Sequence, residues 1–340
     1  MPAFVEISCV TRQREVRDFE LKSRLRFFAG CVSTGLIILG AASACAQEFP
    51  NRPVRIVTSP PGGSNDFAAR LIASGMAGGL GQPVVIDNRP TALTPPVVAK
   101  SAPDGYTLLV TGGSFMFGHL LQTLTYDPIK DFSPVSVVNL QPNVVVVHPS
   151  LQVKSVKDLI ALAKARPGEL NYASGAIASM NHLSAELFKS MAGVNIVHIP
   201  FKGTGPALNA MLGGEVLLMI VNPASIMQHV KSGRLLALAV TSARPSALVP
   251  GLPTVAAAGV PGYEAVLLTA VFAPVGTPTA VIGRLNQEMV RAINRPEIKA
   301  QFLSAGTEPV GSSPGELATA MNAEMSKYGK IIKDAGIRVE

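Results

Sequence analysis

From Val54 onward the chain alternates short β-branched runs with amphipathic segments of helical period, and this alternation most constrains the fold. Such alternation is typical of βαβ units built around a parallel sheet. No internal repeat or low-complexity linker divides this body. At about 150 residues per domain, a chain of 340 residues predicts two domains. Strands or short crossovers, and not a flexible tether, must then join them.

The elements follow from these periods. The expected strands are 54–58, 84–87, 106–110, 143–148, 170–173, 195–199, 215–221, 235–241 and 270–273. The expected helices are 65–77, 156–165, 182–191, 206–212, 224–231, 280–294, 296–305 and 314–335. Ser155 and Ser313 stand where N-caps are needed, and Pro314 and Glu316 suit the first turn of the last helix.

The first 46 residues have the pattern of an N-terminal extension with a secretory signal. An uncharged run, 27–47, follows Lys22, Arg24 and Arg26, and small residues at Ala44-Cys45-Ala46 predict cleavage after Ala46. Alternatives are a retained membrane anchor and a lipoprotein acylated at Cys45. All three cysteines lie in this segment. The body is therefore thiol-free, which excludes a Cys-dependent enzyme, an iron–sulfur protein and a thiolate zinc site.

The charge distribution and the histidine spacing argue against a nucleic-acid-binding protein and against a metalloprotein. The formal charge is +7, but the 29 Lys and Arg residues are scattered and no basic run with interleaved aromatics indicates a nucleic-acid groove. The five histidines show neither H-x-x-x-H nor H-x-H spacing, so we expect no metal and no cofactor. Gly311-Ser312-Ser313-Pro314-Gly315 formally matches a G-x-S-x-G nucleophile elbow, but 308–310 is a poor strand. A role as N-cap of the last expected helix accounts for Ser313 without catalysis, so we expect that the protein is not an enzyme.

Three glycine- or small-residue-rich loops each join an expected strand to an expected helix. They are the loop 60–66, the loop 174–181 and the loop 199–206, which includes Lys202 and Thr204. Glycine lets backbone N–H groups approach a ligand, and a helix N-terminus favours anions. Tight turns with capping residues are the alternative interpretation. Three such loops without a metal, a thiol or an acid/base pair favour holding an anion over transforming it.

At these loops and beyond them the chain resembles the Bug, or TctC-type, extracytoplasmic receptors of tripartite tricarboxylate transporters. The matching stretches include Phe49-Pro50-Asn51-Arg52-Pro53, Gly62-Gly63-Ser64-Asn65-Asp66, Asn88-Arg89-Pro90, Pro103-Asp104-Gly105-Tyr106-Thr107-Leu108, Tyr126-Asp127-Pro128, Pro200-Phe201-Lys202-Gly203, Pro261-Gly262-Tyr263 and Ala273-Pro274-Val275-Gly276-Thr277-Pro278. They occur in order from about Phe49 to Ile337, which is essentially the whole body.

The resemblance implies an α/β periplasmic-binding-protein fold of Venus flytrap, type II-like form, with strands crossing between two domains. Domain 1 would take 47–147 plus 268–340 and domain 2 would take 148–267. The receptor would be a periplasmic monomer that captures a small organic carboxylate for membrane permease subunits. A ligand-dependent sensor acting on a membrane signalling protein is the alternative. The implied ligand-binding residues are Pro61, Gly62, Gly63, Ser64, Asp66, Ser114, Ser174, Ser179, His182, Thr204 and Asn222.

Several positions depart from the family's usual pattern. Thr91-Ala92-Leu93-Thr94-Pro95-Pro96 replaces a glycine-rich stretch, and Ala176 and Ala178 stand where glycine is common. Val221 takes the place of a frequent Asp, and Leu268 that of a common Trp. These changes predict a more apolar pocket that favours a simple organic acid over an amino acid, with binding either retuned or lost.

Overall fold

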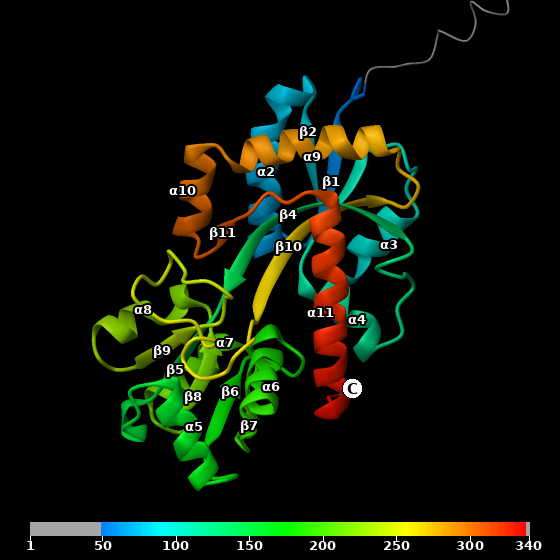
Figure 1. Ribbon diagram of the computed structural model, residues 1–340. Helices are drawn as coiled ribbons and strands as arrows, with labels where there is room; N and C mark the ends of the chain where they lie inside the picture. The colour runs from blue at the N-terminus through cyan, green and yellow to red at the C-terminus, as the bar shows by residue number, and fades with distance from the viewer. Residues whose placement is uncertain (1–48, 338–340) are drawn as a thin grey trace, which may run out of the picture. The chain divides into compact units, whose positions relative to one another are not determined.

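The computed structural model describes residues 49–337, with the side chain of Ser114 excepted. The expected extension, signal segment and cleavage point after Ala46 lie outside these residues. The compact unit that carries the fold begins at Arg52. It contains two β-sheets flanked by helices, which confirms the α/β class and the expected type of fold (Figure 1).

The first sheet has the order β11-β4-β10-β3-β1-β2. Its strands are β1 (Val54–Thr58), β2 (Val84–Asn88), β3 (Thr107–Thr111), β4 (Phe132–Pro142), β10 (Val266–Pro274) and β11 (Glu308–Pro309). β1 pairs in parallel with β2 and β3, whereas β10 runs antiparallel to β3 and β4, and β11 antiparallel to β4. Within this sheet, the prediction of parallel pairing is therefore right for β1, β2 and β3 only.

The second sheet has the order β7-β6-β8-β5-β9. Its strands are β5 (Val144–Val147), β6 (Asn171–Ser174), β7 (Val197–Pro200), β8 (Leu218–Val221) and β9 (Leu236–Val240). β6 is parallel to β7 and β8, while β5 is antiparallel to β8 and β9. We call each sheet with its helices a lobe. The expected domain limits at 147/148 and 267/268 stay a prediction.

Helices connect most of the strands. They are α2 (Ser64–Leu80), α3 (Thr94–Ala99), α4 (Gly113–Leu121), α5 (Val156–Ala165), α6 (Met180–Ala192), α7 (Thr204–Leu212), α8 (Pro223–Lys231), α9 (Thr279–Ile293), α10 (Pro296–Ser304) and α11 (Pro314–Asp334), with 3-10 turns η2 (Thr91–Leu93) and η3 (Pro149–Leu151). Every expected strand and helix overlaps an observed one. α5 has the expected bounds, and the Ser155 side chain accepts the Asp158 N–H as its N-cap.

Four elements were not expected from the sequence. β4 is interrupted by polar residues and Pro134, and α4 is mostly apolar, with His119 near its end, and starts at glycines, so neither shows a clear period. α3 begins with Pro95 and Pro96 in its first turn, a position that proline tolerates. The segment 308–310 was expected to be a poor strand, and only its two residues Glu308–Pro309 pair with β4.

The last helix, α11, joins the apolar cores of the two lobes. Leu317, Tyr328 and Ile332 lie in the first-lobe core, whereas Ile331 packs with second-lobe residues such as Tyr172. Accordingly, α11 contacts β4 and α4 of the first lobe and α6 of the second. In Figure 1 it runs beside α4 and ends near α6.

Candidate functional site

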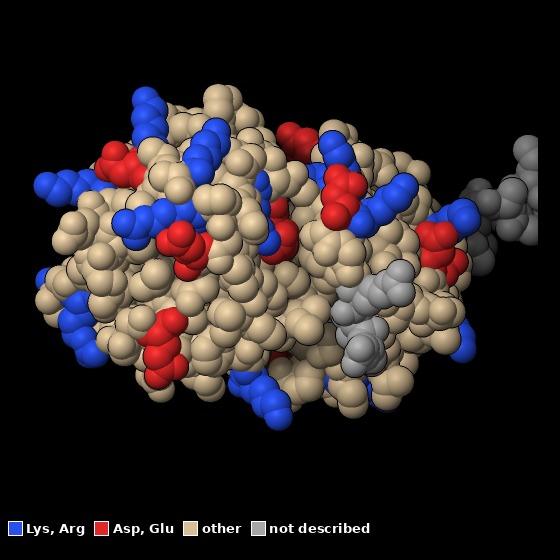
Figure 2. All heavy atoms as spheres, turned by 90° about the horizontal axis from the view of Figure 1, so that it is seen from below, with Lys and Arg blue, Asp and Glu red and all other residues tan. Residues whose placement is uncertain are grey.

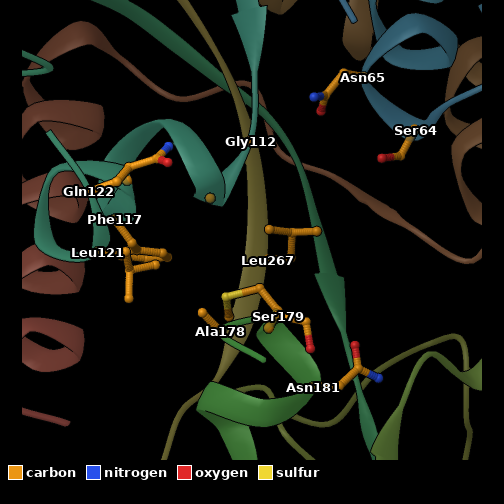
Figure 3. A pocket seen from close by; sticks show the side chains of 13 residues that line it. Ser64, Asn65, Gly112, Phe117, Leu121, Gln122, Ala178, Ser179, Asn181 and Leu267 are labelled. Atoms are coloured by element: carbon orange, nitrogen blue, oxygen red, sulfur yellow. The ribbon is translucent and has the colours of Figure 1, made fainter. Parts of the chain in front are cut away.

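A cavity of about 410 Å³ lies where the first-lobe helices α2 and α4 meet α6 of the second lobe. Figure 3 shows its side chains coming from these helices around Leu267 of β10. The lining residues are Ser64, Asn65, Gly112, Gly113, Phe117, Gly118, Leu121, Gln122, Ala178, Ser179, Met180, Asn181 and Leu267. The loops 60–66 and 174–181 therefore contribute to one cavity.

The lining is neutral and has one apolar wall. None of these lining residues is charged, and Phe117, Leu121, Met180 and Leu267 supply the apolar surface. Three helices begin at the cavity, and neither Gly63 before α2 nor Gly112 before α4 offers a side-chain cap. Their first N–H groups and helix dipoles favour an anion. An anion with an apolar body fits this combination.

Asp66 holds the first-lobe loop from behind. Its carboxylate is buried and accepts the Gly62 N–H at 3.0 Å, Arg70 Nε at 3.1 Å and Asn88 Nδ2 at 2.7 Å. Burial acts to raise the pKa of Asp66, but these hydrogen bonds and the Arg70 charge outweigh it and lower the pKa. Asp66 therefore stays ionised and fixes the loop, and it does not line the cavity.

The second-lobe loop is held differently, through His182. Its buried ring accepts the Ala178 N–H at Nδ1 over 2.9 Å. Ala178 has φ 59°, in the left-handed region that favours glycine. Next to it, Ser179 caps α6 by accepting the His182 N–H and donates to the Ala176 carbonyl. Ala178 and Ser179 line the cavity, whereas His182 lies beneath them.

Three rings stack below this loop, and we call Tyr172, His198 and His182 the ring column. His182 and His198 have centroids 4.0 Å apart, and Tyr172 stacks on His198 at 4.8 Å. His198 Nε2 lies 2.7 Å from Ser174 Oγ, and the buried Ser174 hydroxyl donates to the Ala176 carbonyl. Burial, and then the neighbouring His198, lower the pKa of His182 to about 4. The ring is therefore neutral near pH 7.

The remaining predicted site residues lie around the cavity. Pro61, Gly62 and Gly63 are exposed in the turn before α2, and Ser114 lies in the first turn of α4. Thr204 opens α7, and a Cβ added at Gly175 would meet its N atom at 2.9 Å. Asn222 caps α8 by accepting the Ala224 N–H at 2.7 Å. Of the predicted set, Ser64 and Ser179 line the cavity, and the ligand contacts of the whole set stay predictions.

Among the positions that depart from the family's usual pattern, Ala178 lines the cavity, but the 91–96 segment, Val221 and Leu268 do not. The 91–96 segment forms η2 and the start of α3 and contributes nothing to the cavity lining. Val221 and Leu268 are buried in the two cores. Because side chains alternate along a strand, Leu268 points away from the cavity that Leu267 lines. The pocket is apolar, as expected, but through other residues.

Several lining residues were missed. Phe117 and Leu121 belong to α4, which gave no sequence signal, and Gln122 caps the C-terminal end of that helix. Leu267 lies in a part of β10 that was not expected to be a strand. Asn65 and Asn181 stand in the highlighted loops, so the strand–loop–helix pattern could have found them. Asn181 Nδ2 donates to the Ile220 carbonyl of β8 at 2.8 Å, which fixes its orientation.

Outside the cavity, Ser313 has the structural role expected of it. Its hydroxyl caps α11, and Glu316 accepts the Ser313 N–H in a capping box. Within residues 49–337, no His, Cys, Asp and Glu side chains group closely enough to hold a metal ion. No helix of that part combines the length and apolar character that a membrane span requires. Figure 2 shows basic and acidic side chains interspersed on one face of the molecule.

Comparison with known proteins gives the family. The model of the tripartite tricarboxylate transporter family receptor, TctC, matches residues 68–337. The chain belongs to this receptor family. Protein BugT of Bordetella pertussis is 38% identical over 307 residues, covering 88% of this chain and 94% of its own.

Solved structures of the family agree with the fold described above. R. palustris Rpa4515 with adipate is 38% identical, with a TM-score of 0.68 over 86% of this chain and 100% of its own. MatC from Rhodopseudomonas palustris, with bound malate, is 30% identical, with a TM-score of 0.64 over 84% of this chain and 100% of its own. The chain is thus a periplasmic solute-binding receptor of the TctC type.

Proposed function

We propose that the receptor captures a small organic carboxylate in the cavity between α2, α4 and α6 and delivers it to the membrane permease subunits of a tripartite transporter. One observation carries this proposal: the cavity has a neutral lining into which helices without side-chain caps begin. The N–H groups at these helix starts can donate hydrogen bonds to the carboxylate of a ligand. No charged side chain of the protein has to be buried with it. Adipate and malate in the related structures support the same class of ligand.

The apolar wall narrows the class to acids with an unsubstituted carbon chain. Along this wall Phe117, Leu121 and Met180 offer no partner for a hydroxyl group on the chain, although polar residues line other parts of the cavity. No carboxylate lines the cavity to pair with an ammonium group. Burying such a polar group without a hydrogen bond costs roughly 1–3 kcal/mol. Adipate should therefore bind more tightly than malate, and aspartate should bind least.

Calorimetry of the purified protein without its first 46 residues, titrated with adipate, malate and aspartate, tests this order of affinities. Leu267→Ala removes apolar contact at the centre of the cavity and should weaken adipate binding about tenfold. Leu236→Ala on β9, outside the cavity, is the matched control and should leave the affinity unchanged. Tightest binding of aspartate, or no binding of any of the three acids at millimolar concentration, would contradict the proposal.

The other parts of the proposal concern the whole protein. The receptor catalyses no reaction, because the hydroxyl of Ser313, the candidate nucleophile, is committed to the α11 capping box. The family match favours transport over sensing. The domains divide at 147/148 and 267/268, and the exported protein is a monomer that starts at Gln47. N-terminal sequencing and light scattering of the secreted protein test these last two points.

A further inference from the structure

We propose that His182 is a positioning residue that acts through its Nδ1 atom, holding the cavity loop at Ala178 and Ser179 in its binding conformation without touching the ligand. The inference rests on the proposed function, because it explains how one wall of that cavity is built. His182 lies in the first turn of α6, and its side chain is 6% exposed. It is not among the lining residues, whereas the loop that it holds is.

The backbone at Ala178 needs an external restraint. An alanine at φ 59° is less stable than one in the right-handed region, because its Cβ crowds the following carbonyl oxygen. The hydrogen bond from the Ala178 N–H to His182 Nδ1, 2.9 Å long, is the interaction that can offset this cost. The next residue, Ser179, then presents its side chain at the cavity edge (Figure 3). The orientation of this wall depends on one ring nitrogen.

The ring column fixes the orientation of that nitrogen. His182 is stacked within 12° of parallel on His198, and His198 within 21° on Tyr172. Tyr172 OH donates to Glu186 Oε1 at 2.6 Å, and Lys189 Nζ donates to the same atom at 2.6 Å. The column therefore runs from a buried strand of the second sheet to the cavity loop. Because Nδ1 accepts a hydrogen bond, the neutral ring carries its proton on Nε2.

Burial keeps the ring neutral although a carboxylate lies nearby, because burial and then His198 lower the pKa of His182 more than Glu186 raises it. Glu186 Oε1 lies 3.9 Å from His182 Nε2, and Lys189 neutralises that carboxylate from the same helix. His198 on β7 and Tyr172 on β6 are the titratable groups that face the ring from the sheet. Burial lowers the pKa values of both histidines. Near pH 7, therefore, no added proton competes with the Ala178 N–H for the Nδ1 lone pair of His182.

Two amide substitutions separate the roles of the two ring nitrogens. In His182→Asn the side-chain oxygen can take the place of Nδ1, whereas in His182→Gln the amide reaches the place of Nε2. We expect the Ala178 amide proton of the ligand-free protein to exchange slowly in wild type and in His182→Asn. In His182→Gln and His182→Ala it should exchange about tenfold faster. Equal exchange in all four proteins, or better protection by Gln than by Asn, would overturn the inference.

Binding of adipate is the second measurement. Affinity should fall about tenfold in His182→Gln and His182→Ala and stay within about threefold of wild type in His182→Asn. Adding Ala178→Gly to His182→Ala should restore part of the affinity, because glycine adopts the left-handed backbone without a restraint. Melting temperatures separate this effect from a general loss of stability.

The two measurements fail independently. If wild type binds none of the carboxylates, the proposed function falls while amide exchange still decides the role of His182. If adipate binds but His182→Gln binds it as well as wild type does and His182→Asn does not, Nε2 contacts the ligand and the positioning role is wrong. If Ala178→Gly restores nothing to His182→Ala, the left-handed backbone is not what His182 holds.

Discussion

The two loops that face each other across the cavity have the same strand–loop–helix plan but are held by opposite chemistry. In the first lobe, the ionised Asp66 gathers Gly62, Arg70 and Asn88 around a charge. In the second lobe, neutral stacked rings hold Ala178 through one nitrogen. A loop held by a carboxylate needs that group ionised, whereas a loop held by His182 needs the ring uncharged. The two halves of the site should therefore respond to different conditions.

The largest expected effect is that of acid, which should weaken the loop held by His182 before the loop held by Asp66. The folded pKa of His182, about 4, lies below its ordinary value of 6.5, so the unfolded chain binds more protons between these values. The free energy of unfolding should therefore fall by about 3 kcal/mol as the pH drops from 6.5 to 4. The lowered pKa of Asp66 keeps its loop intact through this window, since its contribution is lost only below pH 3.8. Urea unfolding at a series of pH values measures this loss.

His182→Asn is the matched control for the acid response, because it keeps an acceptor at the same place without a titrating ring. Its stability should depend less steeply on pH between 6.5 and 4 than that of wild type. Equal slopes for both proteins would show that carboxylates, and not the ring column, produce the acid response.

Substitution of Asp66 should break the first-lobe loop instead. In Asp66→Ala, Asn88 and the Gly62 N–H lose a charged acceptor, and we expect a loss of about 2 kcal/mol in the free energy of unfolding at pH 7. Asp66→Asn keeps the size of the side chain and should lose about half as much. Amide exchange should rise at Gly62 and not at Ala178. A rise at both loops would mean that they are one cooperative unit.

The smallest effect should come from Ala178→Gly. Relief of the left-handed backbone, roughly 1–2 kcal/mol, is partly offset by the greater freedom of glycine in the unfolded chain. We expect a net gain of about 0.5 kcal/mol. Ala176→Gly, in the same loop but without a positive φ, should instead lose about 0.5 kcal/mol. Thermal unfolding of the two variants compares them, and destabilisation by Ala178→Gly would argue against strain at that residue.

The same contrast explains what could be predicted from sequence. Elements with a clear period and caps, such as α5 after Ser155 and α11 after Ser313, were located closely. The loops 60–66 and 174–181 were found because glycines and small residues stand between a strand and a helix. α4 was missed, since a mostly apolar helix that starts at Gly113 shows neither a polar face nor a cap. Because α4 was missed, the cavity residues Phe117 and Gln122, the latter at the C-terminal end of this helix, were missed as well.

The roles of the site residues needed the tertiary structure. The family resemblance implies that His182 and Asp66 contact the ligand, and this stays a prediction; what the structure adds is that both side chains bind loop backbone. Nothing in the local sequence shows that His198, on the next strand, stacks on His182. Likewise, only the pairing register of β10 with β4 decides that Leu267, and not Leu268, faces the cavity. Long-range pairing of this kind is invisible to local patterns.

The position of α11 has a consequence for how the protein matures. Its residues complete the core of the first lobe through Leu317 and Tyr328 and reach the second through Ile331. Synthesis delivers a chain from its N-terminus, so all the strands of both sheets are made before this helix. Until then both lobes leave apolar surface open to proteases and chaperones. A variant without α11 should therefore expose apolar surface in both lobes at once, so both halves of the receptor depend on a single helix.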